Sequence, residues 1–114
     1  MILGIGCDIV SISRISNILV KTPAFLTNVF SADELEEYHR RGDDISYLAS
    51  RFAAKEAIVK AYKEYNNRLN TIEILNKDSR DPYVKINGVI MNNIMISISY
   101  ETDYAIAYAV LLSI

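Results

Sequence analysis

The spacing of apolar residues switches from helical to alternating in the second half of this chain of 114 residues, and that switch limits the possible folds more than any other feature. From residue 12 to about residue 65 the apolar side chains recur at helical spacing, which indicates amphipathic helices. After Asn66 and Asn67 they follow a period of two in short runs, which indicates strands. Together with a strand-like first segment, this predicts an α+β fold with a mostly antiparallel sheet packed against a long helix. A doubly wound α/β fold fits less well, because no helical segment separates the later strands.

Local signals predict the individual elements. Ser11 and Ser31 are suitable N-caps, and Glu34 follows Ser31 at the spacing of a capping box. Helices are expected from residue 12 to just before Pro23, from 31 to about 42 and from 45 to about 65, with a loop or helical turn at 24–30. Strands are expected at 2–10, 71–75, 83–86, 95–99 and 104–112, and turns at 77–82, 87–88 and 101–103. No repeat or linker interrupts the chain, so residues 1–114 form one predicted domain.

Composition excludes several classes of protein. A hydrophobic share of 51% argues against disorder, and a formal net charge of −2 argues against bulk binding of nucleic acid. The longest apolar stretch, residues 104–112, is far shorter than the about 20 residues that a membrane-spanning helix needs. The single Cys and the absence of a signal-peptide pattern favour a cytoplasmic location.

The first strand contains an unusual carboxylate. Alternation places Gly4, Gly6 and Asp8 on one face and the apolar residues, Cys7 among them, on the other. Glycines within a strand often mark a bulge or the close approach of a backbone or ligand. Taken alone, however, the strand favours a solvated or helix-capping Asp8. We expect Cys7 to be a core residue rather than a nucleophile.

The long helix contains a second unusual carboxylate. At about 100° per residue, Glu56 falls in the apolar stripe, with Lys60 one turn further on towards its edge. The stripe consists of Ile45, Leu48, Ala49, Phe52, Ala53 and Val59. One explanation is a structural Glu56–Lys60 ion pair. The other is a magnesium site formed by Asp8 and Glu56, with Arg51, Lys55 and Lys60 binding a phosphate ligand instead of serving as ordinary surface charge. The residues by themselves leave the two explanations equal.

These residues lie in motifs that resemble a known family. Residues 4–14 (GIGCDIVSISR) and 51–61 (RFAAKEAIVKA) are similar to the two signatures of the holo-acyl-carrier-protein synthases, which are small phosphopantetheinyl transferases. Residues 30–35 (FSADEL) and 97–105 (SISYETDYA) add further matches, so the resemblance covers essentially the whole chain.

The resemblance implies a specific reaction. Such enzymes transfer the phosphopantetheine arm of coenzyme A to a serine of an acyl carrier protein and release adenosine 3',5'-bisphosphate, a step that serves fatty acid biosynthesis. By resemblance, Asp8 and Glu56 would hold magnesium, Lys60 would lie near the phosphates, and Arg14 would lie on the carrier-docking helix. The family usually forms homotrimers with active sites shared between subunits. For the proton of the serine, the best acceptor is Glu56 or a water beside it. We expect the only His, His39, to be a surface residue.

Three departures from the family pattern concern the nucleotide end. Tyr100 stands where the family commonly has His, residues 62–67 (YKEYNN) lack the usual glycines, and residues 80–82 (RDP) replace a frequent Gly-Lys-Pro turn. Two other hypotheses therefore stay open, a catalytically inactive trimeric homologue that binds coenzyme A and carrier, and a purely structural domain.

The last strand, with tyrosines on one face and alanines on the other, fits a subunit interface or a two-sided core strand, and the residues alone slightly favour the core strand. An acidic carrier would be attracted by four exposed cations, Arg14, Lys21, Arg40 and Arg41.

Overall fold

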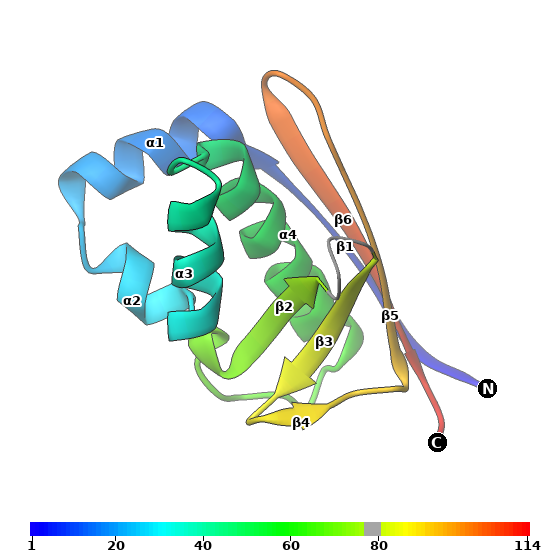
Figure 1. Cartoon of the computed structure of the whole chain (residues 1–114). Helices are drawn as coiled ribbons and strands as arrows, with labels where there is room; N and C mark the ends of the chain where they lie inside the picture. Colours follow the sequence, from blue (N-terminus) through cyan, green and yellow to red (C-terminus); the bar gives the residue numbers. More distant parts are fainter. Residues whose placement is uncertain (77–80) are drawn as a thin grey trace.

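The computed structural model describes residues 1–76 and 81–114 and has the predicted α+β architecture. Its main sheet is antiparallel with strand order β1–β6–β5, and the long helix α4 lies across one face of it (Figure 1). A second antiparallel sheet, of order β2–β3–β4, lies beside the main one. The strands are β1 (Ile2–Ser11), β2 (Ile72–Asn76), β3 (Pro82–Ile86), β4 (Val89–Ile90), β5 (Ile94–Tyr100) and β6 (Tyr104–Leu112). The helices are α1 (Ile12–Lys21), α2 (Phe25–Val29), α3 (Ala32–Arg40), α4 (Ile45–Ala61) and the 3-10 turn η1 (Leu69–Thr71).

The capping signals act where they were expected. The Ser11 side chain accepts a hydrogen bond from the backbone N–H of Arg14, and Ser31 forms a complete capping box with Glu34. Helix α4 begins after Asp44, but it ends at Ala61 rather than near residue 65. The apolar spacing continues through Tyr62 and Tyr65, yet these tyrosines follow the helix in a turn closed by a hydrogen bond from Tyr65 N to Tyr62 O. The predicted turn at 77–82 lies mostly outside the described residues.

Helix α4 is enclosed on nearly all sides, and this corrects the predicted apolar stripe. Residues all around the helix are buried, including Ala54, Lys55 and Ala57, which do not belong to the stripe. Ile45, Phe52, Glu56 and Val59, by contrast, are only half-buried. A helical wheel assumes that one apolar face packs against the core and the opposite face meets solvent. This assumption fails for a helix that has neighbours all around it. Glu56 therefore lies on the more open side of α4 and not in the core.

Gly4 and Gly6 allow β1 to lie directly against α4. A Cβ atom on Gly6 would be 2.0 Å from the carbonyl oxygen of Ala57, and one on Gly4 would be 2.0 Å from that of Ala61. No side chain fits at such a separation. The glycines therefore mark a close approach of backbones, as expected, and the backbone approached is that of the helix which carries Glu56.

The other face of the main sheet is apolar and uncovered in the single chain. Ile5, Ile9, Met95 and Tyr108 are each at least 54% exposed. Cys7 lies on this face, paired across the strands with Tyr108, and is exposed, so its prediction as a core residue is wrong for the chain by itself. The prediction of a two-sided core strand at 104–112 is also wrong, because only the alanine face of β6 packs against α4.

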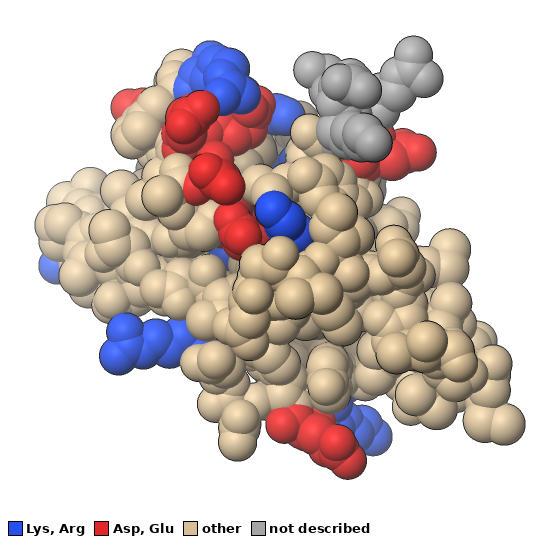
Figure 2. Space-filling view, turned by 60° about the horizontal axis from the view of Figure 1, so that its bottom comes forward, with Lys and Arg blue, Asp and Glu red and all other residues tan. Residues whose placement is uncertain are grey.

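Charged residues are unevenly distributed over the surface. Figure 2, which brings the lower side of Figure 1 forward, shows a broad area without Lys, Arg, Asp or Glu, with the charged side chains gathered in a few groups around it.

In the part of the chain that the structure describes, no helix is long and apolar enough to cross a membrane.

Candidate active site

Asp8 and Lys60 meet where β1 crosses α4. Lys60 Nζ lies 3.2 Å from Asp8 Oδ1 and donates a hydrogen bond of 2.9 Å to the carbonyl oxygen of Cys7. The Asp8 side chain is 19% exposed and the Lys60 side chain 53% exposed, so the pair lies at the surface. Asp8 is on the face of β1 that turns towards the helix, opposite Ala107 of β6. The strand carboxylate is therefore neither free in solvent nor a helix cap.

Glu56 belongs to the same cluster. Partial burial raises the pKa of Glu56, the nearby negative charge of Asp8 raises it further, and Lys60 opposes both effects. The effect of the Asp8 charge on Glu56 indicates that the two carboxylates lie near each other on the same side of α4. Among the ion pairs of the described residues, Lys60 pairs with Asp8 and not with Glu56, so the simple intrahelical pair is not the arrangement found.

The donor set of this cluster suits magnesium. The ion prefers oxygen ligands and is usually held by one or two carboxylates, with substrate phosphates and water completing its shell. Asp8 and Glu56 supply two such carboxylates, and residues 1–76 and 81–114 contain no group of three or more His, Cys, Asp or Glu that could hold a metal alone. A site of this kind depends on its phosphate ligand to complete the coordination.

Lys55 does not reach this cluster, and its prediction as a phosphate ligand is wrong. It is completely buried, and its ammonium group lies 2.6 Å from Glu34 Oε1, 2.6 Å from the carbonyl oxygen of Val29 and 3.1 Å from that of Leu69. Burial raises the pKa of Glu34 and lowers the pKa of Lys55, because a low-dielectric interior disfavours both charges. The local sequence around Glu34 indicates only a capping residue, because nothing local shows that its other oxygen accepts a hydrogen bond from the N–H of Ile74.

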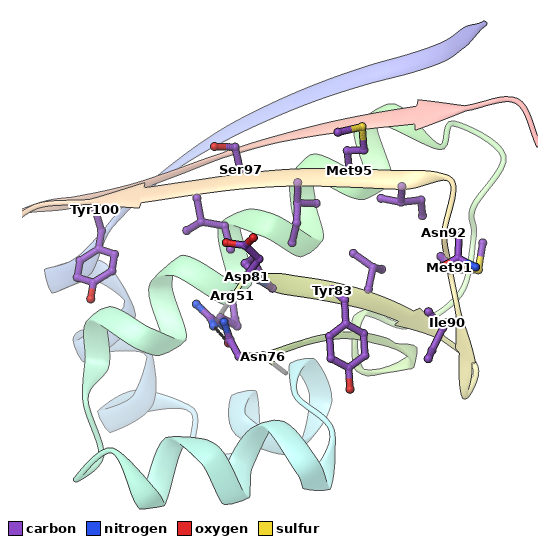
Figure 3. Close-up of a pocket in the computed structure, with 15 residues that line it drawn as sticks. Arg51, Asn76, Asp81, Tyr83, Ile90, Met91, Asn92, Met95, Ser97 and Tyr100 are labelled. Atoms are coloured by element: carbon purple, nitrogen blue, oxygen red, sulfur yellow. Dashed lines mark hydrogen bonds between the residues drawn. The ribbon is translucent and has the colours of Figure 1, made fainter. Parts of the chain in front are cut away.

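Arg51 lies in a different place from the carboxylates. It lines a cavity of about 580 Å³ between α4, the second sheet and β5 (Figure 3). Arg51 precedes Glu56 by five residues, which rotates the two side chains by about 140° around the helix at about 100° per residue. Asp8 belongs to β1, at the opposite edge of the main sheet from β5. The sequence-predicted site residues therefore form two groups, and one chain alone does not bring Arg51 to Asp8, Glu56 and Lys60.

The same cavity contains two of the three places at which the chain departs from the family pattern, whereas residues 62–64 line a separate pocket. Tyr100 projects into it from β5, and Asp81 and Pro82 line it at the start of β3 (Figure 3). Arg80 lies outside the described residues. Two of the departures therefore affect the cavity around Arg51, and none of the three replaces Asp8, Glu56 or Lys60.

The predicted docking surface for an acidic carrier includes fewer unpaired cations than the four that the sequence suggested. Arg14 is exposed on α1, as expected, and no ion pair within the described residues involves it or Lys21. Arg40 and Arg41, however, are paired with Glu36 and Glu37 along α3. Their charges are largely compensated, which leaves α1 as the more positive element.

Comparison with known proteins agrees with the fold and with the family resemblance. Residues 4–109 match the model of the 4'-phosphopantetheinyl transferase superfamily. The chain is 41% identical to the holo-[acyl-carrier-protein] synthase of Thermodesulfovibrio yellowstonii, over 97% of this chain and 99% of that protein. The crystal structure of the synthase from Neisseria meningitidis superposes with a TM-score of 0.87 at 31% identity, covering 99% of this chain and 100% of that one.

A second solved structure carries a ligand. It is the synthase from Bacillus anthracis in complex with coenzyme A (3',5'-ADP), with a TM-score of 0.78 and 31% identity over 97% of this chain and 96% of that one. A family model that matches nearly the whole chain, together with these relatives, confirms the resemblance found in the motifs. The chain belongs to the 4'-phosphopantetheinyl transferase superfamily, among its holo-[acyl-carrier-protein] synthases.

Proposed function

We propose that this chain transfers the phosphopantetheine arm of coenzyme A to a serine of an apo-acyl carrier protein in a magnesium-dependent reaction. The observation that carries this proposal is the cluster of Asp8, Glu56 and Lys60, in which two interacting carboxylates and one cation lie together at the surface. This combination suits a pyrophosphate bound through a divalent ion. A purely structural ion pair would need only one of the two carboxylates.

In this reaction the serine oxygen attacks the phosphorus that bears the pantetheine. A new O–P bond forms, the P–O bond to the adenosine-bearing phosphate breaks, and adenosine 3',5'-bisphosphate leaves with that electron pair. Asp8 and Glu56 would hold magnesium, which when bound neutralises pyrophosphate charge and orients the leaving group. Lys60 would stabilise the negative charge that develops on the phosphate oxygens. Glu56, or a water beside it, is the group of this cluster that suits the role of acceptor for the serine proton.

We further propose that two copies of the chain form each active site, within a homotrimer. The separation of Arg51 and its cavity from the carboxylate cluster supports this arrangement, because a ligand as long as coenzyme A could contact one group on each of two subunits. The apolar outer face of the main sheet also supports it. Exposed patches of this kind are usually covered by a partner, and Ile5, Ile9, Met95 and Tyr108 would be buried in such an interface.

The test is to incubate the protein with apo-carrier protein, coenzyme A and magnesium, and to weigh the carrier by mass spectrometry. We expect one added phosphopantetheine per carrier, and no addition with Asp8→Ala, with Glu56→Ala or with a magnesium chelator. Coenzyme A binding without any mass change would support the inactive homologue. Analytical ultracentrifugation would test the trimer separately, and a monomer with full activity would exclude shared sites.

A further inference from the structure

Arg51 is a buried cation whose hydrogen-bond and aromatic partners among the described residues are neutral. It is only 6% exposed, although its side chain lines the cavity between α4 and β5. Its Nη1 donates to Ser50 Oγ at 3.1 Å and its Nη2 donates to the side-chain oxygen of Asn76. The Cζ atom lies 4.5 Å from the centroid of the Tyr47 ring. A hydroxyl, an amide and an aromatic ring thus hold this guanidinium in place.

Such an arrangement gives Arg51 no direct carboxylate partner among the described residues, although Asp81 lines the same cavity. A buried cation normally has a carboxylate partner, because the loss of hydration is otherwise costly. Across residues 1–76 and 81–114, no ion pair includes Arg51, and its Nε is buried without a hydrogen-bond partner. Lys55, on the same helix and also buried, shows the usual solution, since it pairs directly with Glu34.

Tyr47 is held firmly enough to orient the guanidinium. It is only 3% exposed, and Arg41 lies 4.8 Å from its ring centroid, fixed in turn by a 2.7 Å hydrogen bond from Nε to Glu37. Ser50 donates its only proton to the carbonyl oxygen of Tyr47 at 2.8 Å. The Ser50 oxygen is therefore restricted to accepting from Arg51.

We propose that Tyr47 and Asn76 are positioning residues that hold Arg51 at the cavity without neutralising it, so that a phosphate group of the bound ligand supplies the missing negative charge. This inference rests on the proposed function, which makes coenzyme A that ligand. The neutral amide of Asn76 is essential to the proposal. An aspartate there would have nearly the same shape and would also accept from Arg51, but it would cancel the charge that the ligand needs.

The test is calorimetric titration of coenzyme A and of dephospho-coenzyme A into the wild type and five variants, without carrier protein. We expect Asn76→Asp and Tyr47→Leu each to weaken coenzyme A binding roughly tenfold. Tyr47→Phe keeps the aromatic ring and should bind coenzyme A like the wild type. In an Arg51→Met background, Asn76→Asp should cause no further loss. If dephospho-coenzyme A binding is unaffected by the variants, Arg51 contacts the 3'-phosphate; if both ligands lose affinity, it contacts the pyrophosphate.

A merely structural role gives a different pattern. Asn76→Asp would then be the mildest variant, and its effect would persist in the Arg51→Met background. Either result would overturn the proposal. Thermal denaturation checks that each variant folds, and Asn76→Asp, nearly identical in size to the wild type, carries the test if Tyr47→Leu does not fold. A wild type that binds coenzyme A but transfers nothing would contradict the proposed function and leave this inference open to the same titrations, whereas a wild type that binds neither ligand would contradict both.

Discussion

Lys60 Nζ lies 3.2 Å from Asp8 Oδ1, which joins a helix cation to a strand carboxylate 52 residues away in the sequence. The contact places a positive charge against one of the two carboxylates that we propose as magnesium ligands. Lys60 and a metal ion therefore compete for the negative charge of Asp8, while both would attract a phosphate ligand.

Replacing Lys60 should consequently separate metal binding from catalysis. We expect Lys60→Met to raise the affinity of the ligand-free protein for magnesium by roughly threefold to tenfold, since a surface charge at this distance is partly screened. The same variant should transfer phosphopantetheine much more slowly. Calorimetric titration with magnesium, with the exposed Lys63→Met as a matched control, measures the first effect. Weaker magnesium binding by Lys60→Met would mean that Lys60 supports the site instead of competing with the ion.

The titration of Glu56 should depend on Asp8. Burial and the Asp8 charge both raise the pKa of Glu56, so in the metal-free protein it holds its proton to a higher pH than an ordinary glutamate. We expect Asp8→Asn to lower the pKa of Glu56 and Lys60→Met to raise it. Nuclear magnetic resonance of the carboxyl carbon measures both shifts.

The same shift has a consequence for stability. Because the pKa of Glu56 is raised on folding, the folded state binds more protons than the unfolded state between the two pKa values. Glu56 therefore favours folding at low pH, and this contribution is lost as the pH rises through the folded-state value. The metal-free Asp8→Asn protein should show a smaller loss over that window in chemical denaturation. An identical pH profile for the two proteins would show that Asp8 does not act on Glu56.

Gly6 should not tolerate any side chain. In Gly6→Ala the new Cβ would be 2.0 Å from the carbonyl oxygen of Ala57, so β1 and α4 must separate. We expect a loss of about 3 kcal/mol or more in the free energy of unfolding, the upper range of overpacked positions. Gly42→Ala is the control. It has open space around it but a φ of +72°, and should cost about 1 kcal/mol. Equal losses in the two variants would mean that β1 and α4 are less closely packed than described.

The buried Lys55–Glu34 pair should matter for stability and not for ligand binding. Lys55→Met leaves the Glu34 carboxylate buried without its cation, which typically costs about 3–5 kcal/mol. Chemical denaturation measures this loss, and Lys63→Met on the exposed surface should cost little. At denaturant concentrations below its unfolding transition, the folded Lys55→Met variant should bind coenzyme A like the wild type. A selective loss of coenzyme A affinity in a fully folded variant would restore Lys55 as a ligand.

Arg14 should affect the binding of the carrier protein but not the binding of coenzyme A. It is exposed on α1 and has no ion-pair partner among the described residues. We expect Arg14→Glu to raise the KM for an acidic carrier protein about tenfold, because like charges then face each other, while the affinity for coenzyme A stays constant. Steady-state kinetics at several salt concentrations measure this, with Lys63→Glu as a control of equal charge change. Unchanged carrier kinetics would remove Arg14 from the docking surface.

Much of the fold could be predicted from local sequence. The serine caps at Ser11 and Ser31, the strand at residues 104–112 and the α+β class all follow from signals between near neighbours, and the structure confirms each of them. The glycines of β1 also indicated a close backbone approach. Local chemistry determines such features, because hydrogen bonds and steric contacts between near neighbours act wherever the segment lies.

The distribution of the site residues, in contrast, was decided by tertiary structure. Arg51, Lys55 and Glu56 are near neighbours on one helix, yet they point respectively to a cavity, to a buried ion pair and to the surface cluster with Asp8. Their motif predicted the family but could not separate these roles. A helix surrounded on nearly all sides sends each side chain to a different neighbour, and those neighbours come from distant parts of the chain. The sequence by itself determined which elements form and which charged residues are available for a ligand, whereas packing determined which of those residues are buried in ion pairs and which remain accessible.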